Sequence, residues 1–406
     1  MRFNNIFKEH SGAKAFFLSI VVWGVGTGCF ASALNNFLSD IYQMDSLHRG
    51  WLEFFREFPG LILVLLFALL SRVSDWKILR LGTLISMCGA AMIMVPADKI
   101  YVTGAIMVWS LGEHLIMPAR QMIAMQVAKP EHAGQSLGFM TSVMNFGTVA
   151  GSLLVAAIFY FGSRRGGWAQ MSLFYAVWAV VIILLLISLV SSFTSDAPNA
   201  ITKRPKVYFH RKFSKFYALE LFYGARKQIF MTFAPYVLIQ VYGFSTARMA
   251  LLLGICALVN IWAAPIVGRI TDRVGYRNVM IWDTIILFFV CVMYGFAKDI
   301  FPARLVLPAV CLNFLLDAVI STTALATNIY VREIASDSNE LASTMSTGIS
   351  INHLISILAA PLGGWIWMRY GIGVLFLFSA GMAICNSLFA YTLPRPRIVS
   401  NDTNAG

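Results

Sequence analysis

Hydrophobic residues occur in long blocks along this chain, each bounded by charged residues, glycine or proline. A helix of about 20 apolar residues crosses about 30 Å of hydrocarbon, and many of these blocks reach or approach that length. The pattern predicts an all-α integral membrane protein. Its twelve transmembrane helices are expected at residues 14–38, 50–71, 79–97, 101–128, 134–161, 168–193, 214–241, 247–268, 278–297, 302–331, 340–368 and 371–393.

The longest loop lies between the sixth and seventh predicted helices. It divides the chain into two halves of six helices each. We expect an N-terminal six-helix bundle over residues 1–193, a cytoplasmic linker over 194–213, a C-terminal bundle over 214–393 and a cytoplasmic tail over 394–406.

Composition excludes a water-soluble protein. Only 12% of the residues are charged, against about 25% in soluble domains, and 58% are hydrophobic, with a mean hydropathy of +0.73. Lys and Arg are roughly twice as frequent in the loops that share a side with both termini as in the opposite loops. This bias predicts a cell (inner or plasma) membrane protein with both termini in the cytoplasm. The net charge of +12 is then explained by contact with anionic lipids, and not by nucleic acid.

Motifs for other chemistries are missing from the sequence. The six cysteines fall within spans, one or none per helix, which gives neither a disulfide framework nor a metal-ligand spacing. There is no HExxH, no Gly-x-Ser-x-Gly and no nucleotide-binding motif. We therefore expect no enzyme activity, no cofactor, no resident metal and no direct use of ATP.

Two segments repeat at a fixed displacement. Tyr42–Gly50 resembles Tyr242–Ala250, 200 residues later, and a span followed by a basic turn comes after each. The acids of the two turns, Asp75 and Asp272, are 197 residues apart. Such a repeat predicts two parallel six-helix halves with a substrate site near the midplane where they meet.

The second basic turn carries a family resemblance. Residues 268–277 read Gly-Arg-Ile-Thr-Asp-Arg-Val-Gly-Tyr-Arg. They resemble the signature Gly-x-x-x-Asp-Arg-x-Gly-x-Arg of the major facilitator superfamily of transporters at every defined position. Anchoring by positive charge alone would explain Arg273 and Arg277 but not Gly268, Asp272 and Gly275. The resemblance implies that these residues form a latch at the inner gate, in which the acid and the arginines pair across helix ends.

The first-half copy of this turn is degraded. It keeps Asp75 and Arg80, but has Ser71, Trp76 and Ile78 where the signature has Gly, Arg and Gly. Asp75 and Arg80 are included among the expected gating residues. A glycine pair in the fifth helix, Gly147 and Gly151, partly matches a feature of drug antiporters, but close helix packing explains it equally well.

Ionisable residues inside the spans supply the candidate site, because a charge in the membrane is costly and usually faces protein or water. Four of them, Glu113, Arg226, Lys227 and Asp317, are expected roughly 20 Å from a helix end, near the midplane. Two interpretations stay open. The cations bind a substrate, or they form internal salt bridges with Glu113 or Asp317. Glu53, Arg56 and Glu57 are expected to pair on one helix face near the outer end, and Asp283 and His353 to be structural hydrogen-bonding residues.

The resulting hypothesis is a secondary transporter that works by rocker-switch alternating access and carries a small polar, anionic organic solute coupled to protons. Glu113 and Asp317 are the expected proton carriers. The expected partners are the small-molecule substrate, protons and membrane lipids, and the protein is expected to be a monomer that binds no nucleic acid. The alternative is efflux of amphipathic drugs or lipids, for which the many Met and aromatic residues would suit a pocket. The expected substrate-binding residues are Arg226, Lys227, Glu113, His114, Asp317, Asn35, Asn36 and Gln228.

Overall fold

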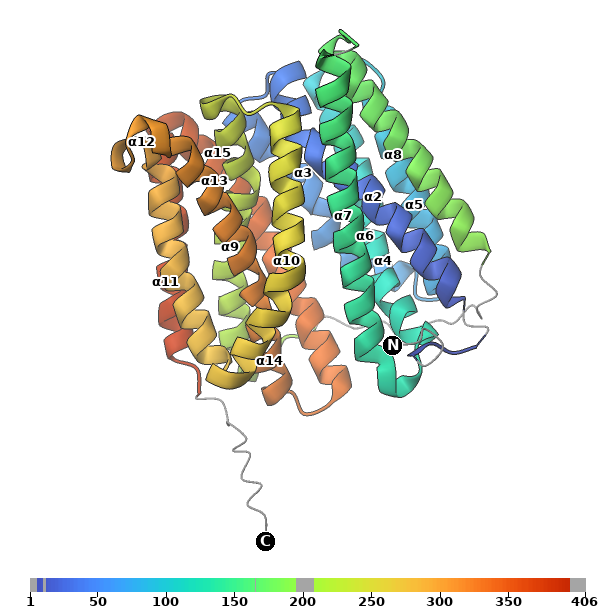
Figure 1. Ribbon diagram of the computed structural model, residues 1–406. Helices are drawn as coiled ribbons and strands as arrows, with labels where there is room; N and C mark the ends of the chain where they lie inside the picture. Colours follow the sequence, from blue (N-terminus) through green and yellow to red (C-terminus); the bar gives the residue numbers. More distant parts are fainter. Residues whose placement is uncertain (1–5, 10–11, 165, 195–207, 395–406) are drawn as a thin grey trace.

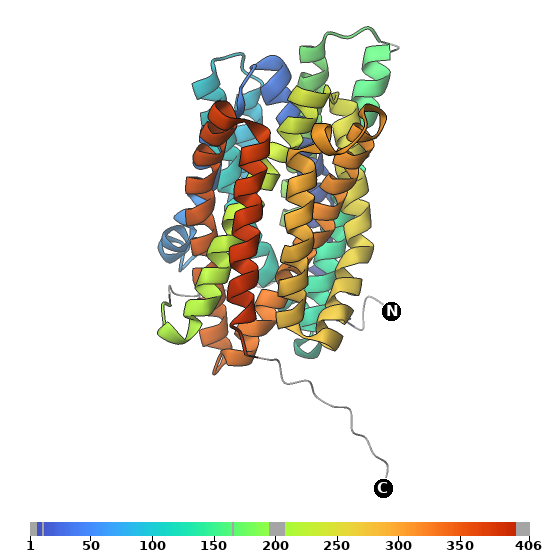
Figure 2. The ribbon, with the colours of Figure 1, turned by 90° about the vertical axis from the view of Figure 1, so that its left-hand side faces the viewer.

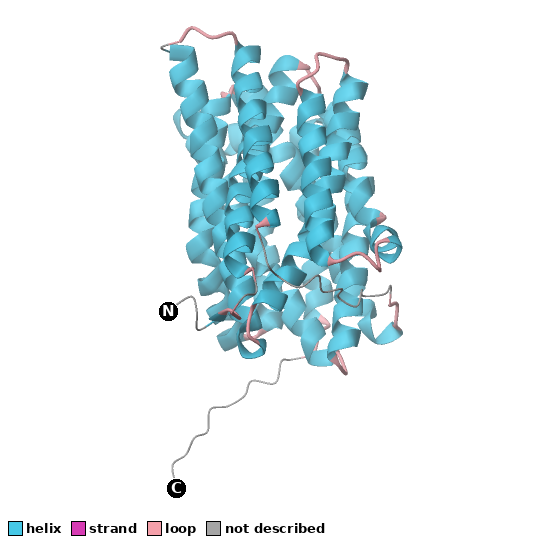
Figure 3. Cartoon of the chain, turned by 90° about the vertical axis from the view of Figure 1, so that its right-hand side faces the viewer, coloured by secondary structure: helices cyan, strands magenta, loops and turns pink. Residues whose placement is uncertain are grey.

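The computed structural model describes residues 6–9, 12–164, 166–194 and 208–394, and this part of the chain is built from helices joined by short loops (Figure 3). Nine helices within it are long and apolar enough to cross a membrane. Most of the predicted linker (residues 195–207) and nearly all of the predicted tail (residues 395–406) lie outside the described residues. The helices run side by side (Figure 1).

The first half of the chain supplies the helices on the right of Figure 1. They are α2 (Ala13–Asn36), which continues as a wider π-helical turn (Phe37–Ile41), α3 (Ser46–Leu61), α4 (Leu63–Leu69), α5 (Asp75–Ile93), α6 (Lys99–Val127), α7 (Ala133–Arg164) and α8 (Gln170–Phe193).

The second half supplies the helices on the left. They are α9 (Ser214–Tyr236), again followed by a π-helical turn (Val237–Val241), α10 (Thr246–Val274), α11 (Tyr276–Gly295), the short α12 (Ala297–Ile300), α13 (Ala303–Ile320), α14 (Leu325–Ile334) and α15 (Ser338–Tyr391). α15 holds the last two predicted spans. It bends at Gly371, whose φ of 86° favours glycine, and its two legs stand next to each other (Figure 2).

The repeat found in the sequence is also a structural repeat. After each π-helical turn the chain reverses through a residue with positive φ, Gln43 (48°) and Gly243 (63°). The next amide then bonds back to the helix at 3.0 Å, from Met44 to Leu38 and from Phe244 to Leu238. The two turns are therefore built in the same way at positions 200 residues apart.

Several predicted helix ends were wrong, and two of these errors affect the site. α3 begins at Ser46, four positions before the predicted 50, because the Asp45 side chain accepts a hydrogen bond from the His48 amide and caps the helix. α10 continues to Val274, past the predicted 268, since a helix can extend beyond the lipid once its side chains are polar. Gly268, Asp272 and Arg273 therefore lie on the last turns of α10.

Glycines set how closely helices approach within the first half. A Cβ on Gly147 would lie 2.7 Å from the Gly24 carbonyl carbon, and one on Gly151 would lie 2.3 Å from the Val25 oxygen. Both contacts join α7 to α2. The fifth-helix glycine pair therefore serves close packing of two helices in this structure.

The two halves meet closely at one end of the bundle. We call the end that contains residues 42–45 and 242–245 the turn end, and the end that contains Phe193 and Ser214 the linker end. At the turn end, a Cβ on Gly50 would lie 2.4 Å from the Ala360 oxygen, and one on Gly364 would lie 2.5 Å from the Ser46 oxygen. The Gln240 amide also donates to the Met44 oxygen at 2.9 Å.

The linker end is different. An added Cβ at Gly134 or Gly138 on α7, or at Gly268 on α10, would meet nothing within 4 Å. Asp272 and Arg273 are exposed, and no hydrogen bond or ion pair joins either to another described residue. The halves are thus closed on each other at the turn end, whereas these three positions at the linker end have no neighbour.

Candidate functional site

Ionisable side chains gather about halfway along the helices that pack against each other where the two halves meet. Glu57 lies about 17 Å from the start of α3, His114 about 22 Å from the start of α6 and His353 about 22 Å from the start of α15. Glu57 is deeper than predicted, because α3 starts earlier. We call the following set the central layer, in which Arg120 and Glu220 lie nearest the linker end, about 10 Å from the ends of α6 (Val127) and α9 (Ser214): Arg56, Glu57, Glu113, His114, Arg120, Glu220, Arg226, Lys227, Asp317 and His353.

Acids and arginines of α3 form a chain of ion pairs. Arg49 Nη2 lies 2.6 Å from Glu53 Oε1, Arg56 pairs with Glu53 as well, and Arg56 Nη2 lies 2.5 Å from Glu57 Oε1. The sequence placed Arg49 in an outer loop. The predicted helix began at residue 50 and so left Arg49 outside it, which was wrong, since Arg49 is 3% exposed on the first turn of α3 and donates to Asn35. Pairing of Glu53, Arg56 and Glu57 on one helix face agrees with the expectation.

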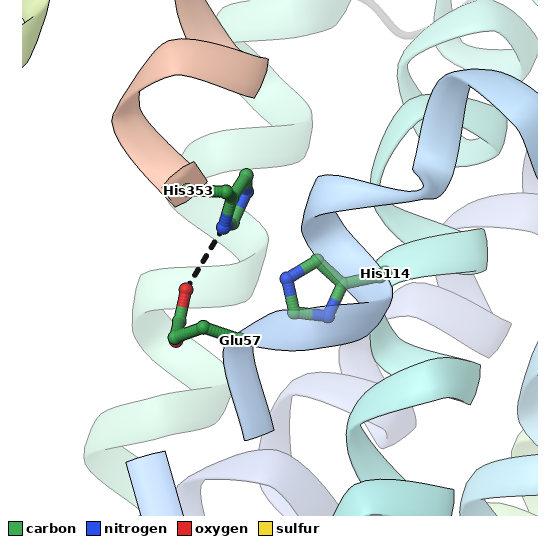
Figure 4. Close-up of side chains that lie close together, drawn as sticks. All are labelled: Glu57, His114 and His353. Carbon is green, nitrogen blue, oxygen red and sulfur yellow. Dashed lines mark hydrogen bonds and ion pairs between the residues drawn. The ribbon is translucent and has the colours of Figure 1, made fainter. Parts of the chain in front are cut away.

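Three side chains from three helices meet at the boundary between the halves. Glu57 Oε2 lies 2.9 Å from His353 Nδ1, and the rings of His114 and His353 are 5.0 Å apart (Figure 4). His114 Nδ1 lies 2.8 Å from the Ser110 carbonyl oxygen. Gly60 makes room for this group, because a Cβ there would fall 2.6 Å from His353 Nδ1 and 2.7 Å from His114 Nε2.

Arg226 is held within the second half. Its Nη1 lies 3.5 Å from Asp317 Oδ1, and its guanidinium lies 4.8 Å from the centre of the Tyr223 ring. Arg226 is 1% exposed. The sequence left two interpretations of Arg226 open. In this structure it forms the internal salt bridge, which joins α9 to α13.

Lys227, Glu113 and Arg120 are unpaired charges of the layer. None of the three makes a hydrogen bond or an ion pair with a described residue, and all are half-buried. The Lys227 ammonium interacts electrostatically with the carboxylates of Glu57 and Glu220. Glu113 interacts in the same way with Arg56 and Arg120. A charge left partly exposed at mid-depth faces water or protein, because contact with lipid would cost several kcal/mol.

The neutral residues of the predicted site bond to protein groups. Asn35 accepts from Arg49, and the Asn36 amide donates to the Phe244 oxygen at 2.9 Å. Both lie near the turn end and not in the central layer. Gln228, on α9, donates to the Thr232 hydroxyl at 2.9 Å.

The last arginine of each basic turn has the same role in both halves. Arg80 Nη2 donates to the Ser192 oxygen at 2.7 Å, which ties α5 to α8. Arg277 Nη2 donates to the Tyr391 oxygen at 2.7 Å, which ties α11 to α15. Gly275 takes a φ of 83° in the turn between α10 and α11, where a side chain would be strained.

Asp75 is buried in the first half. It begins α5, where the helix dipole favours an acid, and it accepts from Gln126 at 2.6 Å. Asp272, its counterpart, is exposed. The two acids of the repeat therefore have different surroundings in this structure.

One groove lies away from the central layer. It has a volume of about 610 Å³, lies between α3 and α6 towards the turn end, and is lined mainly by apolar side chains such as Leu52, Phe55 and Met107. Trp51 and Ile100 at its edge are 49% and 81% exposed. The groove therefore faces outwards towards lipid.

Sequence reasoning missed the meeting of Glu57 with His114 and His353. The three residues are spread over almost 300 positions, and a pattern of spacing along the chain carries no signal for such a contact. Their common depth is a usable signal, but only once the start of α3 has been placed correctly at its Asp45 cap.

Comparison with known proteins agrees with this architecture. The family model described as Major Facilitator Superfamily matches residues 15–327. None of the curated proteins matches the chain significantly. The structure is similar to the nucleoside transporter NupG, with a TM-score of 0.73 at 12% identity over 94% of this chain and 100% of that one.

Two further solved structures share the fold. The xylose transporter XylE from E. coli, in an inward open conformation, has a TM-score of 0.72 at 13% identity over 95% of this chain and 96% of that one. The human organic anion transporter MFSD10 has a TM-score of 0.63 at 10% identity over 93% and 98%. The predicted all-α transporter fold is confirmed, and the chain belongs to the Major Facilitator Superfamily.

Proposed function

We propose that this secondary transporter carries a small organic anion by alternating access, and that Lys227 is the cation that binds it. The observation that carries the proposal is the unpaired, half-buried ammonium of Lys227 at mid-depth. Arg226, the other candidate at this depth, has Asp317 as its counter-ion. The unpaired Arg120 lies nearer the linker end, about 10 Å from the end of α6. A carboxylate or phosphate of the substrate would supply the partner that Lys227 lacks.

Proton coupling follows from a second unpaired charge of the layer. Protonation of Glu113 would remove a negative charge from the layer that contains Lys227, and the affinity for an anion would rise. By linkage, the bound anion would in turn favour protonation of Glu113. Asp317 is the second proposed carrier, since its protonation would release Arg226 from their 3.5 Å pair.

The proposed orientation is the one that the basic residues favour, with both termini in the cytoplasm of a cell-membrane protein. The linker end then faces the cytoplasm, and the structure represents an inward-facing state. Asp272 and Arg273, exposed at that end, would pair only when the inner gate closes. The similar xylose transporter structure is also an inward open one.

Efflux of amphipathic compounds or lipids is the second candidate. The apolar groove between α3 and α6 supports it, because a lipid-facing groove of about 610 Å³ can accept an acyl chain or a drug-sized molecule. It offers no explanation for the unpaired charges of the central layer. We therefore rank anion transport first.

A thermal-shift screen of the purified protein tests the proposal. A substrate that binds the folded state raises its melting temperature. We expect organic anions to do so, whereas neutral sugars, neutral nucleosides and cationic drugs should not. The shift should disappear in Lys227→Gln and remain in Lys77→Gln, which removes an exposed lysine near the start of α5. Equal stabilisation of wild type and Lys227→Gln by every ligand found would rule out the binding role of Lys227.

A further inference from the structure

Three potential metal ligands converge between the two halves. One atom from each of Glu57, His114 and His353 lies within 4.8 Å of the others, and the residues belong to α3, α6 and α15 (Figure 4). Glu57 and His114 are buried, and His353 is half-buried. We propose that this group is a binding site for a divalent transition-metal ion of the Zn²⁺ type, which is separate from the proposed anion site.

The imidazole of His114 is already oriented for coordination. Its Nδ1 faces the Ser110 carbonyl oxygen at 2.8 Å, and a carbonyl can only accept. The proton must therefore be on Nδ1, which leaves the lone pair of Nε2 free. A histidine that ligates a metal usually donates its other nitrogen to a carbonyl or a carboxylate in this way.

Gly60 leaves room beside the two ligand nitrogens. A Cβ at this position would lie 2.6 Å from His353 Nδ1 and 2.7 Å from His114 Nε2, so a side chain would press on both rings. Its absence lets the rings move until both nitrogens reach the Zn–N distance of about 2.0–2.1 Å from one ion placed between the three ligands.

Glu57 supplies the third ligand. Its Oε2 lies 2.9 Å from His353 Nδ1, a separation that two neighbouring ligands of one ion can share. In the metal-free structure this distance is a hydrogen bond and needs a proton on Nδ1. For Nδ1 to ligate the ion, His353 must instead carry its one proton on Nε2, a change of tautomer that solvent can mediate without net release of a proton.

The three ligand atoms favour one type of metal, and charges of both signs surround them. Arg56 pairs with the other oxygen of Glu57, and Lys227 on α9 also lies within reach of this acid, whereas Glu113 and Glu53 contribute negative charge from α6 and α3. Hard ions such as Mg²⁺ and Ca²⁺ need several oxygens, which are lacking among these three ligands. Two imidazoles and one carboxylate instead suit Zn²⁺, Ni²⁺ or Co²⁺.

Metal binding at this place would act on the conformational equilibrium. Glu57 and His114 belong to the first half and His353 belongs to the second, so the ion would bridge the halves in the state that is closed at the turn end. A ligand that binds one of two states shifts the population towards it. We therefore expect Zn²⁺ to hold the turn end closed and to inhibit transport.

Isothermal titration of the full-length purified protein with ZnCl₂, after treatment with a chelator, tests the site without any substrate. We expect one saturable Zn²⁺ site that Mg²⁺ does not fill. His114→Gln, His353→Gln and Glu57→Gln should each weaken binding at least 10-fold. His48→Gln, which removes an exposed histidine at the turn end, should leave the affinity unchanged.

Gly60→Ala separates loss of the space from loss of a ligand. All three ligands remain in this variant, but its Cβ would press on both imidazole rings, so the Zn²⁺ site should be lost. Size-exclusion profile and melting temperature verify that each variant is folded. If the variant is unstable, His353→Gln alone decides. Wild-type protein that does not bind Zn²⁺, or Zn²⁺ affinity that is equal in wild type and His353→Gln, would overturn the proposal.

A labelling experiment tests the bridging role. Ser46 is 2% exposed at the turn end, so a cysteine introduced there, in a variant whose native cysteines are serines, reacts only when that end opens. Zn²⁺ should slow its alkylation at least 10-fold, and His353→Gln should abolish the protection. An unchanged alkylation rate at saturating Zn²⁺ would show that the ion does not bridge the halves.

Discussion

Arg226 and Asp317 form an ion pair within the second half, with Arg226 Nη1 3.5 Å from Asp317 Oδ1. Arg226 Nε and Nη1 and Asp317 Oδ1 have no hydrogen-bond partner among the described residues, so each depends on the charge of the other. Removing one member of a buried pair leaves an uncompensated charge, and this costs more than the pair itself contributes.

The first prediction concerns this pair. Arg226→Gln and Asp317→Asn should each lower the free energy of unfolding by about 3 kcal/mol, and the double variant should recover most of the loss. Thermal melts of purified variants measure both effects. As a control, Glu340→Gln removes the charge that pairs with partly exposed Lys212 but keeps an oxygen that can accept a hydrogen bond, so it should lower the melting temperature much less. Additive losses in the double variant would show that the two charges do not depend on each other.

The second prediction concerns the turn-end contact. Gly50→Ala places a Cβ 2.4 Å from the Ala360 oxygen, which cannot move away as a flexible side chain would. The variant should therefore close poorly at the turn end, and a cysteine at position 46 should be alkylated at least 10-fold faster. Gly104→Ala is the matched control, because its Cβ would meet nothing within 4 Å. Equal alkylation rates in both variants would argue against a role of Gly50 in closure.

The third prediction concerns Asp272. Since it is exposed and makes no hydrogen bond or ion pair with a described residue, Asp272→Asn should leave expression and melting temperature unchanged. Transport should nevertheless fall at least 10-fold, because the proposed latch forms only in the opposite state. Asp299→Asn, at an exposed acid of the turn end, should transport normally. Normal transport by Asp272→Asn would remove this acid from the gate.

The fourth prediction concerns the two arginines that tie helices within each half. Arg80→Ala and Arg277→Ala each remove a charged hydrogen bond to a main-chain oxygen and a contact with an aromatic ring. Each should lower the free energy of unfolding by about 1.5–3 kcal/mol. Arg72 is an exposed arginine in the first-half basic turn, and Arg72→Ala should change the free energy of unfolding by less than about 0.5 kcal/mol. Thermal melts distinguish these outcomes.

The fifth prediction concerns orientation. Reporter fusions near Asp75, after residue 200 and after residue 400 should report the cytoplasm, and a fusion near Lys99 should report the outside. The prediction follows from the excess of Lys and Arg in loops on the side of the termini. An outside signal at residue 200 would reverse the proposed orientation, and with it the description of this state as inward-facing.

Much of the fold could be predicted because a membrane helix can be recognised in the sequence by its length and its apolar content. The repeat at Tyr42 and Tyr242, 200 residues apart, marks the positions of two turns that have the same backbone structure. Helix ends were harder. The apolar run gives no sign that α3 begins at the Asp45 cap or that α10 continues to Val274, since both extensions are polar.

The central layer was only partly predictable. The cost of burying charge pointed to Glu113, Arg226, Lys227 and Asp317, but partner choice is a property of three-dimensional packing. Depth alone could not tell that Arg226 lies beside Asp317 while Lys227 has no ion pair among the described residues. His353 was interpreted as a structural residue because its contact with Glu57 joins positions 296 residues apart.

One close approach between the halves involves no side-chain charge. Gly50 and Gly364 bring main chain against main chain, at Ala360 and Ser46. Such a seal has no group that titrates or binds a counter-ion, so its strength stays constant when the proton gradient collapses or the ionic strength changes. Under the proposed coupling, protons would act on the charged layer below this contact, so the groups that respond to the proton gradient would be separate from the contact that closes the turn end.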